Sequence, residues 1–441
     1  MKRLSIYGLI IIGLIIQTGC KLDYVNPNGP TDTEITTTKE GMFTLSIGIK
    51  QYYGATAMES VIITPGTTAR EIKGITTFTN VLEMEAGGTA LPTFNGNILN
   101  HWIRFEKTIG MAETLINNAT NVFGADAASA SGVIAHAELF KAMAIGALAT
   151  CFEQFPIETN KTGTAVFVPR VQGLQNAIQL LDDAALRINT TAPSAEFNTR
   201  ILGSDFKLLD CINTYRARYN MMLAKYAESL AAANLVNLTS KSQFLYSTQS
   251  PNPVYNAIVV RIDYKPRENF GLPASLVEAG DGRLAFYLGT PNIVVGGETL
   301  KTVKGFFDDI SKPIPVYLPD EVRLLKAEAI VRSGGNLASA LTEINAVRTQ
   351  ATGDPFGVNA NLPSYSGPVT AADLLTEIYR QRCAELFMTG LRLEDSRRFG
   401  RPAPPANVNP VPLSFERNRN FYPYPDQERL TNTNTPNDPP I

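Results

Sequence analysis

Histidine, the side chain that most often acts as a catalytic acid or base, is scarce in this sequence. Only two histidines, His101 and His136, occur among 441 residues. Two histidines are too few for a metal site with several histidine ligands and leave little choice for a catalytic triad. The sequence contains no Gly-rich phosphate loop, no nucleophile elbow and no paired-cysteine metal motif. Carboxylates are plentiful, but no glycosidase-like pair stands out. We therefore expect a binding protein without catalytic residues, cofactor or metal.

Cys20 is the cysteine whose surroundings define a chemistry. Two cations at the start of the chain and an apolar run from Leu4 to Ile16 lead to Gly19 and Cys20. This order is typical of a signal peptide, because the run is shorter than the roughly 20 apolar residues that a spanning helix needs. A thiol after a small residue at the end of such a run accepts diacylglycerol. We expect residues 1–19 to be removed and Cys20 to carry a lipid anchor; an ordinary cleaved secretion signal is the alternative.

The three other cysteines have no such context. Cys151, Cys211 and Cys383 each stand among apolar residues in segments with helical patterning. An odd number of cysteines outside the cytoplasm argues against a disulfide framework. We expect small buried side chains, of which at most one pair could form a bridge.

The single tryptophan is the residue best suited to hold a ligand by its ring. Trp102 follows Asn97, Asn100 and His101 at a predicted junction between a loop and a helix. Sugars are held by aromatic faces and by polar side chains such as asparagine. These four residues are therefore candidates for a ligand site.

A core position is the open alternative for Trp102, since its spacing also fits an apolar helix face with Phe105 and Ile109. Tyr264 and Phe270, in a later loop region, are weaker candidates for the same ligand site. Sequence spacing alone does not decide between the two positions of Trp102.

Helical patterning predicts the elements that must position these residues. Apolar residues at spacings of three and four predict helices over 41–53, 102–119, 135–155, 172–188, 206–233, 320–333, 337–350 and 373–399. A Gly-rich turn joins 320–333 to 337–350, which predicts a helical hairpin of the tetratricopeptide type. Short apolar runs between turn residues predict strands and loops over 252–313. The predicted fold class is mainly α, a helical-hairpin scaffold with long loops and a few short strands.

The domain organisation follows from composition. Residues 20–38 are polar and rich in Pro, Asn and Gly, which predicts a lipidated tether. Residues 39–441 contain no second composition class and are expected to form a single domain. Within it, the loop-rich parts at about 55–100 and 250–315 are expected to bind the ligand. The tail from Pro402 is expected to be ordered coil.

The charge balance excludes one class of partner. The 39 Lys and Arg residues stand against 41 Asp and Glu residues, and the net charge is −2. No basic stripe could neutralise a phosphate backbone, so a nucleic acid is not expected as a partner.

The most informative stretch runs from Glu377 to Phe399. It contains oppositely charged residues three apart, which share one helix face if 373–399 is a single helix. The expected pairs are Arg382 with Glu385, Arg392 with Asp395, and Asp395 with Arg398. A buried ladder of this kind fixes how a helix docks, so we expect these residues to be scaffold and not ligand site.

This stretch resembles the signature of the SusD/RagB family of nutrient-binding outer-membrane lipoproteins. The matching framework is Arg382, Glu385, Leu386, Gly390, Arg392, Asp395 and Arg398, and the departures are Gln381, Thr389 and Phe399. Further resemblance follows in the family's order at 281–284, at 319–329 with 344–348, and at 421–428. With the lipid signal, the resemblance covers nearly the whole chain, most specifically the part after Asp281.

The resemblance implies a SusD-like fold and a function. Such a protein is lipid-anchored in the outer membrane, faces the cell exterior, and touches the membrane only through its anchor. It captures a glycan and passes it to a SusC-like TonB-dependent outer-membrane transporter. The scarcity of tryptophan keeps an oligopeptide as the alternative ligand, and a glycan-degrading enzyme is the third possibility.

Overall fold

The computed structural model describes residues 32–160 and 162–441, which are mostly helical. The predicted signal peptide and Cys20 lie outside the described residues. Within the stretch predicted to be a tether, α2 (Asp32–Thr37) is a short helix that packs on α3 and α6. The ordered chain therefore begins before residue 38, the predicted end of the tether.

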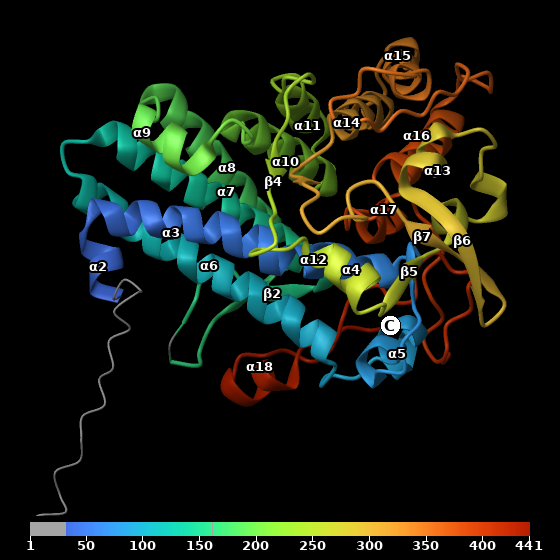
Figure 1. Cartoon of the computed structure of the whole chain (residues 1–441), viewed down its shortest axis with the longest axis horizontal. Coiled ribbons are helices and arrows are strands. Elements are labelled where there is room, and N and C mark those ends of the chain that lie inside the picture. The colour runs from blue at the N-terminus through green and yellow to red at the C-terminus, as the bar shows by residue number, and fades with distance from the viewer. Residues whose placement is uncertain (1–31, 161) are drawn as a thin grey trace, which may run out of the picture.

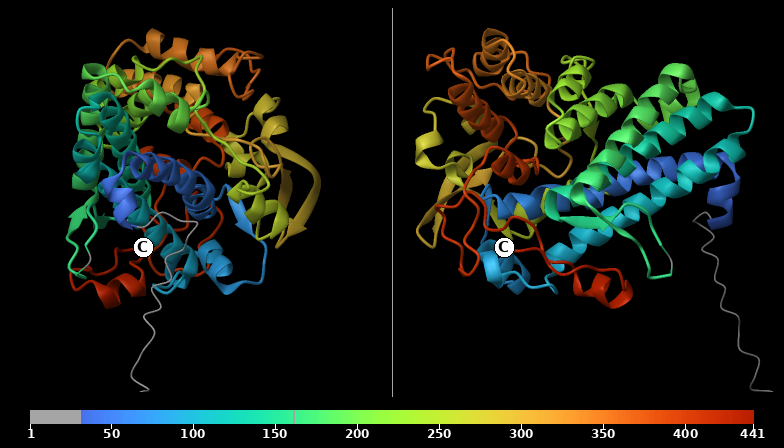
Figure 2. Two further views of the ribbon diagram at one scale, coloured as in Figure 1. Left: turned by 60° about the vertical axis from the view of Figure 1, so that its left-hand side comes forward. Right: turned by 180° about the vertical axis from the view of Figure 1, so that it is seen from behind.

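Helices packed in the order of the chain form the scaffold (Figures 1 and 2). Their bounds are α3 (Lys39–Tyr52), α6 (Gly96–Phe123), α7 (Ala127–Cys151), α8 (Arg170–Thr190), α10 (Leu208–Met222), α11 (Tyr226–Ala233), α14 (Pro319–Arg332) and α15 (Leu337–Arg348). From α6 onward, each of these helices packs on the next one along the chain. This serial packing confirms the predicted helical-hairpin fold class.

The central helix α7 is apolar on every side. It is long and apolar enough to cross a membrane by length and composition, but 94% of its most apolar window is buried inside the protein. Helices α6 and α8 pack on it from two sides, and α3 from a third. Its composition is therefore explained by its place in the core.

Four small antiparallel sheets, each of two strands, connect the remaining segments. They pair β1 (Ile72–Gly74) with β5 (Tyr264–Pro266), β2 (Gln154–Pro156) with β3 (Phe167–Pro169), β4 (Gln243–Phe244) with β8 (Ile314–Pro315), and β6 (Leu288–Val295) with β7 (Glu298–Val303). The strands predicted after residue 252 are present. The short helices α5 (Thr79–Ala86), α9 (Ala195–Phe197), α12 (Pro253–Tyr255) and α13 (Gly282–Tyr287) lie between strands in the chain, and α18 (Asp426–Thr431) follows near its end.

The prediction of a long loop over 55–100 is wrong. Helix α3 continues as a π-helix, η1 (Tyr53–Ala57), and then as α4 (Met58–Thr68). Threonines, a glycine and Pro65 give α4 a poor intrinsic helix propensity. Almost all of its residues are buried, so tertiary packing stabilises a helix that composition alone disfavours.

Two predicted helices are each divided in two. The segment 206–233 forms α10 and α11, with Ala224 at φ 57 between them. The segment 373–399 forms α16 (Ala371–Glu385) and α17 (Arg392–Arg398). At the second break, Gly390 has φ 83, and a Cβ on it would lie only 2.1 Å from the carbonyl oxygen of Val61 in α4. Only glycine fits both requirements.

The break between α16 and α17 changes the charge pairs. Asp395 does pair with Arg398, at 2.9 Å, as predicted. The two other expected pairs are wrong. The turn between the helices brings Asp395 to Arg382, at 2.8 and 3.1 Å, and Glu385 and Arg392 bind other groups. Arg398 also donates two hydrogen bonds of 2.8 Å to Glu328 of α14. We call Arg382, Asp395, Arg398 and Glu328 the ion ladder; it ties α16, α17 and α14 together.

Glu385 and Arg392, which were expected to belong to the ladder, bind other groups. Glu385 lies 3.2 Å from the buried guanidinium of Arg283, which also binds Asp281. Arg392 donates to the carbonyl oxygens of Phe270 and Cys383 at 3.2 and 2.9 Å. These residues are buried, so the prediction that the signature is scaffold agrees with their positions.

The cysteines are small buried side chains, as predicted. Cys151, Cys211 and Cys383 are free and fully enclosed. Burial raises the pKa of each thiol to about 12, so the thiolate is not populated at neutral pH.

Candidate functional site

Trp102 lies inside the protein. Its side chain is only 2% exposed, and its ring lies 4.8 Å from Phe152 in an edge contact and 5.7 Å from Phe167 in a stacked one. The indole nitrogen donates a hydrogen bond of 3.1 Å to Glu428, in the tail of the chain. No face of the ring is open to a ligand in this arrangement, which is the core alternative considered for Trp102.

His101 and Phe270 are also buried. The imidazole of His101 lies between the carbonyl oxygens of Ser60, at 3.2 Å, and Ala147, at 3.1 Å. Burial lowers the pKa of His101 to about 4, so the ring is neutral and its single N–H donates to one of these two carbonyl oxygens. Phe270 packs against Phe387 at 5.4 Å beside the break after α16. A role of these two residues in ligand binding stays a prediction that their burial does not favour.

The structure brings together two of the remaining candidates. The side-chain amide of Asn97 donates to the hydroxyl of Tyr264 at 3.3 Å, although 167 residues separate them. Asn97 also accepts a hydrogen bond of 3.1 Å from Asn80 at the start of α5. Asn100, one turn further along α6, is exposed. Tyr264 is nearly buried, and burial raises the pKa of its hydroxyl, so this group stays protonated.

The geometry at this end of α6 comes from three elements. Asn95 caps the helix, because its side-chain oxygen accepts from the backbone N–H of Asn97 at 2.9 Å. The pairing of β1 with β5 sets Gly74 opposite Tyr264. The side chain of Asn95 also donates to the carbonyl oxygen of Asn80 at 2.9 Å, which fixes α5 against α6. The amides are therefore held in place before any ligand arrives.

Charged side chains continue the same surface. Glu59 of α4 accepts a hydrogen bond from Arg261 and lies 3.5 Å from Arg104 of α6. Arg261 also donates to Asp263 at 2.8 Å. Burial lowers the pKa of Arg261, but Asp263 and Glu59 outweigh this effect and hold that pKa above its usual range. We call the surface formed by Glu59, Asn80, Asn97, Asn100, Arg104, Arg261, Asp263 and Tyr264 the Asn97 patch.

Exposed apolar side chains flank the Asn97 patch. Phe78, two residues before Asn80, is 59% exposed, and Phe94, just before the α6 cap, is 69% exposed. Ile262, between Arg261 and Asp263, is 50% exposed and has φ 56. A β-branched residue in the left-handed region is strained, and such strain concentrates at functional sites.

Part of this surface had a sequence signal. Asn97, Asn100 and Arg104 are spaced by three and four residues, so their position on one helix face could have been predicted. Glu59 and Arg261 come from other segments and had no local signal. The sequence of α6 therefore predicts only part of the patch.

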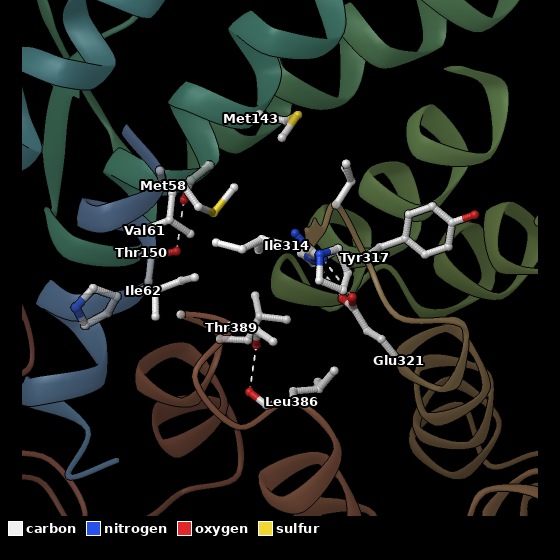
Figure 3. Close-up of a pocket in the computed structure, with 18 of the residues that line it drawn as sticks. Met58, Val61, Ile62, Met143, Thr150, Ile314, Tyr317, Glu321, Leu386 and Thr389 are labelled. Carbon is white, nitrogen blue, oxygen red and sulfur yellow. Dashed lines mark hydrogen bonds and ion pairs between the residues drawn. The ribbon is translucent and has the colours of Figure 1, made fainter. Parts of the chain in front are cut away.

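A second candidate is a cavity at the centre of the molecule (Figure 3). It encloses about 860 Å³, including space open to solvent. Met58 and Ile62 of α4 line one side, and Ile314 and Tyr317 line another. The lining is mainly apolar, which gives few directional contacts to a polar ligand.

The charged groups of this central cavity already bind each other. Arg218 donates two hydrogen bonds of 2.7 Å to Glu321 and lies 4.1 Å from the ring centre of Tyr215. Glu321 is the only carboxylate among the described residues that line the cavity. A glycosidase needs two carboxyl groups facing one bond, so this arrangement does not favour hydrolysis there.

Comparisons with known proteins identify the fold. A model of the SusD family matches residues 313–439. A SusD superfamily protein from Bacteroides thetaiotaomicron is 14% identical, with a TM-score of 0.69, covering 91% of this chain and 100% of the other. A putative sugar binding protein from Bacteroides vulgatus is also 14% identical, with a TM-score of 0.69 and coverage of 91% and 98%. A SusD-like carbohydrate binding protein from the same species is 14% identical, with a TM-score of 0.67 and coverage of 90% and 97%. No curated protein sequence matches the chain.

Proposed function

We propose that this chain, a member of the SusD/RagB family, captures an oligosaccharide at the cell surface and passes it to a TonB-dependent outer-membrane transporter. The observation that supports the proposal is the contact between Asn97 and Tyr264, which joins an amide and a phenol hydroxyl from the two predicted ligand regions. The sugar-binding descriptions of two relatives support the class of ligand. The proposed activity is binding and transfer, without turnover.

The chemistry of the Asn97 patch fits a sugar. Side-chain amides, a phenol and guanidinium groups offer donors and acceptors to vicinal hydroxyl groups. The exposed rings of Phe78 and Phe94 offer apolar faces for the C–H side of a sugar ring. Because Glu59 and Asp263 balance the charges of Arg104 and Arg261, little net charge is left, which suits an uncharged ligand.

The proposed location depends on the beginning of the chain. A lipid on Cys20 would hold the domain at the outer membrane, and residues 21–31 would link the anchor to α2. The membrane contact would then be made by the anchor alone. Fractionation of cells that produce Cys20→Ala tests this: the variant should leave the membrane fraction, and retention without its transporter would contradict the proposal.

The binding proposal is tested at exposed residues of the patch. The double variant Asn100→Ala/Phe78→Ala should weaken binding of an oligosaccharide about tenfold or more, because it removes one polar contact and one aromatic face. A panel of neutral oligosaccharides screened on an array and then titrated by calorimetry gives the measurement. Asn117→Ala, an exposed asparagine further along α6, is the matched control and should bind as the wild type does. Equal binding by the double variant and the control would place the ligand elsewhere.

An oligopeptide is the second candidate ligand. The one tryptophan is buried, so the exposed rings beside the patch are phenylalanines and not the indoles that stack best on sugars. A peptide array tested on the same variants separates the two ligands. Binding of peptides, with no response to any oligosaccharide, would replace the glycan proposal by the peptide one.

A further inference from the structure

A groove outside the Asn97 patch runs along the end of α3 and the start of η1. One wall is formed by Ile47, Lys50 and Gly54, and the other by the segment Gln243–Ser250 together with Asp205. The groove holds about 870 Å³, counting the space open to solvent. The part of it that takes water-sized groups measures about 350 Å³, at the lower end of the range of about 300–1,000 Å³ that is usual for ligand clefts. Figure 1 shows the chain after β4 descending in front of the helices toward α12 and α4.

The wall of this groove is held firmly against the helix. The hydroxyl of Tyr246 donates to the carbonyl oxygen of Gly54 at 2.9 Å. A Cβ on Gly54 would lie 2.8 Å from the ring of Phe244, so the close approach needs glycine. At this point the helix becomes the π-helix η1, a feature that occurs frequently at functional sites. The groove is therefore preformed.

Lys50 places a cation in the groove, where the charge of Asp205 acts on it without a direct ion pair. Its ammonium donates to the carbonyl oxygen of Ile201, and the ring of Phe206 lies 5.7 Å away. Within the described part of the chain it forms no salt bridge, and burial lowers its pKa. An ammonium has three donors, so two remain for the oxygen atoms of a ligand. A half-buried cation that lacks an ion pair gains stability when such oxygens arrive.

The other polar groups of the groove suit an uncharged ligand. Asp205 accepts a hydrogen bond of 3.0 Å from the side-chain nitrogen of Gln243. The side-chain oxygen of Gln243 can then accept a hydrogen bond from a ligand. Gln51 is exposed on the helix wall. With Lys50 and Asp205 both present, the groove carries almost no net charge. Amides, hydroxyls and one ammonium are the groups that bind sugar hydroxyls.

The groove and the Asn97 patch share one helix. Ala55 lines the groove, and Glu59, one turn later, belongs to the patch. At 1.5 Å per residue, about 12 Å separates Gln51 from Glu59 along the helix axis. We propose that the groove is a second subsite of the same ligand. The ligand is then an uncharged oligosaccharide long enough to reach from the Asn97 patch to Lys50. This inference rests on the proposed function.

The test uses linear neutral oligosaccharides of graded length: malto-, xylo-, manno- and cello-oligosaccharides titrated into the full-length mature protein. On the wild type, the affinity of the recognised series should rise about tenfold or more once the chain fills both subsites. In Lys50→Met/Gln51→Ala this gain with length should disappear, while short members bind as before. Lys225→Met, an exposed lysine at the turn before α11, is the control and should keep the gain. Thermal denaturation of each variant checks that the fold is intact.

Other results overturn the inference in distinguishable ways. A gain with length that Lys50→Met/Gln51→Ala retains, but that Asn100→Ala/Phe78→Ala abolishes, rejects the groove and leaves the proposed function standing. A gain that is lost equally in Lys225→Met also rejects the groove, since the effect is then not local. No binding of any neutral oligosaccharide at any length rejects the glycan function and the groove together.

Discussion

The ion ladder and the Asn97 patch both contain arginines and carboxylates, but they hold them in opposite conditions. In the ladder, Arg382, Asp395 and Glu328 are almost completely buried, and each charge is bound by another element of the scaffold. In the patch, Arg261 is exposed and Asn100 has free amide groups facing solvent. The ladder's hydrogen bonds therefore hold the scaffold together, whereas Asn100 and Arg261 of the patch face solvent.

The difference shows that the presence of charged residues does not by itself identify a ligand site. A charged cluster at the centre of a signature motif looks like a ligand site, yet its side chains are buried and bind mainly each other. The patch, with less regular residues, has exposed rings and the strained Ile262. Substitutions should therefore change stability in the ladder and affinity in the patch.

The largest expected effect is at the ladder. Asp395→Ala leaves Arg382 and Arg398 buried without their shared carboxylate, so unfolding should become easier by about 5 kcal/mol. Chemical denaturation gives the free energy of unfolding, and Asp308→Ala, an exposed carboxylate paired only with Lys312, is the control. Unchanged stability together with lost ligand binding would reverse the comparison and make the ladder a site.

The second largest effect is expected for Trp102→Ala. The free energy of unfolding should fall by about 4 kcal/mol, because a cavity replaces a large core side chain. The intrinsic fluorescence of the wild type should have the emission of a buried indole and stay unmoved by any oligosaccharide or peptide. A ligand-dependent shift of that emission would show that Trp102 belongs with the patch after all.

Acid should weaken the ladder. Burial raises the pKa of Asp395, but Arg382 and Arg398 outweigh it and hold that pKa below its usual range; Arg398 does the same for Glu328. The folded state therefore binds fewer protons than the unfolded state. The ladder's contribution is complete above the ordinary carboxyl pKa of about 4 and is lost as the pH falls toward the lower folded value. Unfolding measured from neutral to acidic pH tests this, and Glu328→Gln should flatten the acid slope.

The smallest effect is expected beside the patch. Ile262→Gly should raise the free energy of unfolding by about 0.5 kcal/mol, since relief of the left-handed strain slightly exceeds the entropy cost of glycine. Ile262→Val, which keeps the strain, is the control. A clear loss of stability in the glycine variant would mean that Ile262 contributes packing that its exposure does not suggest.

The sequence predicted the elements whose signal is local. The apolar stripe of α8 and the hairpin of α14 and α15 were expected within a few residues of their bounds. Helix α4 was missed because Pro65 and its threonines oppose a helix and only burial makes it one. The pairing of Arg382 with Asp395 was missed because it depends on the turn at Gly390.

The candidate site was harder to predict for the same reason. Asn97, Asn100 and Tyr264 were named from residue type, but the contact of Asn97 with Tyr264 needs the pairing of β1 with β5. Glu59 and Arg261 are ordinary surface residues in the sequence and become part of the patch only through the fold. Sequence pattern thus found the helix that carries the patch and not the segments that complete it.

The tail that closes over Trp102 bears on when this protein can fold. Glu428 bonds to an indole 326 residues earlier in the chain, and Tyr424 packs against the same aromatic group. The core around α6 is therefore incomplete until almost the last residue has been made, and contacts of such separation form slowly. A chain that ended before Tyr424 would leave Trp102 without its hydrogen bond to Glu428 and without its ring contact with Tyr424.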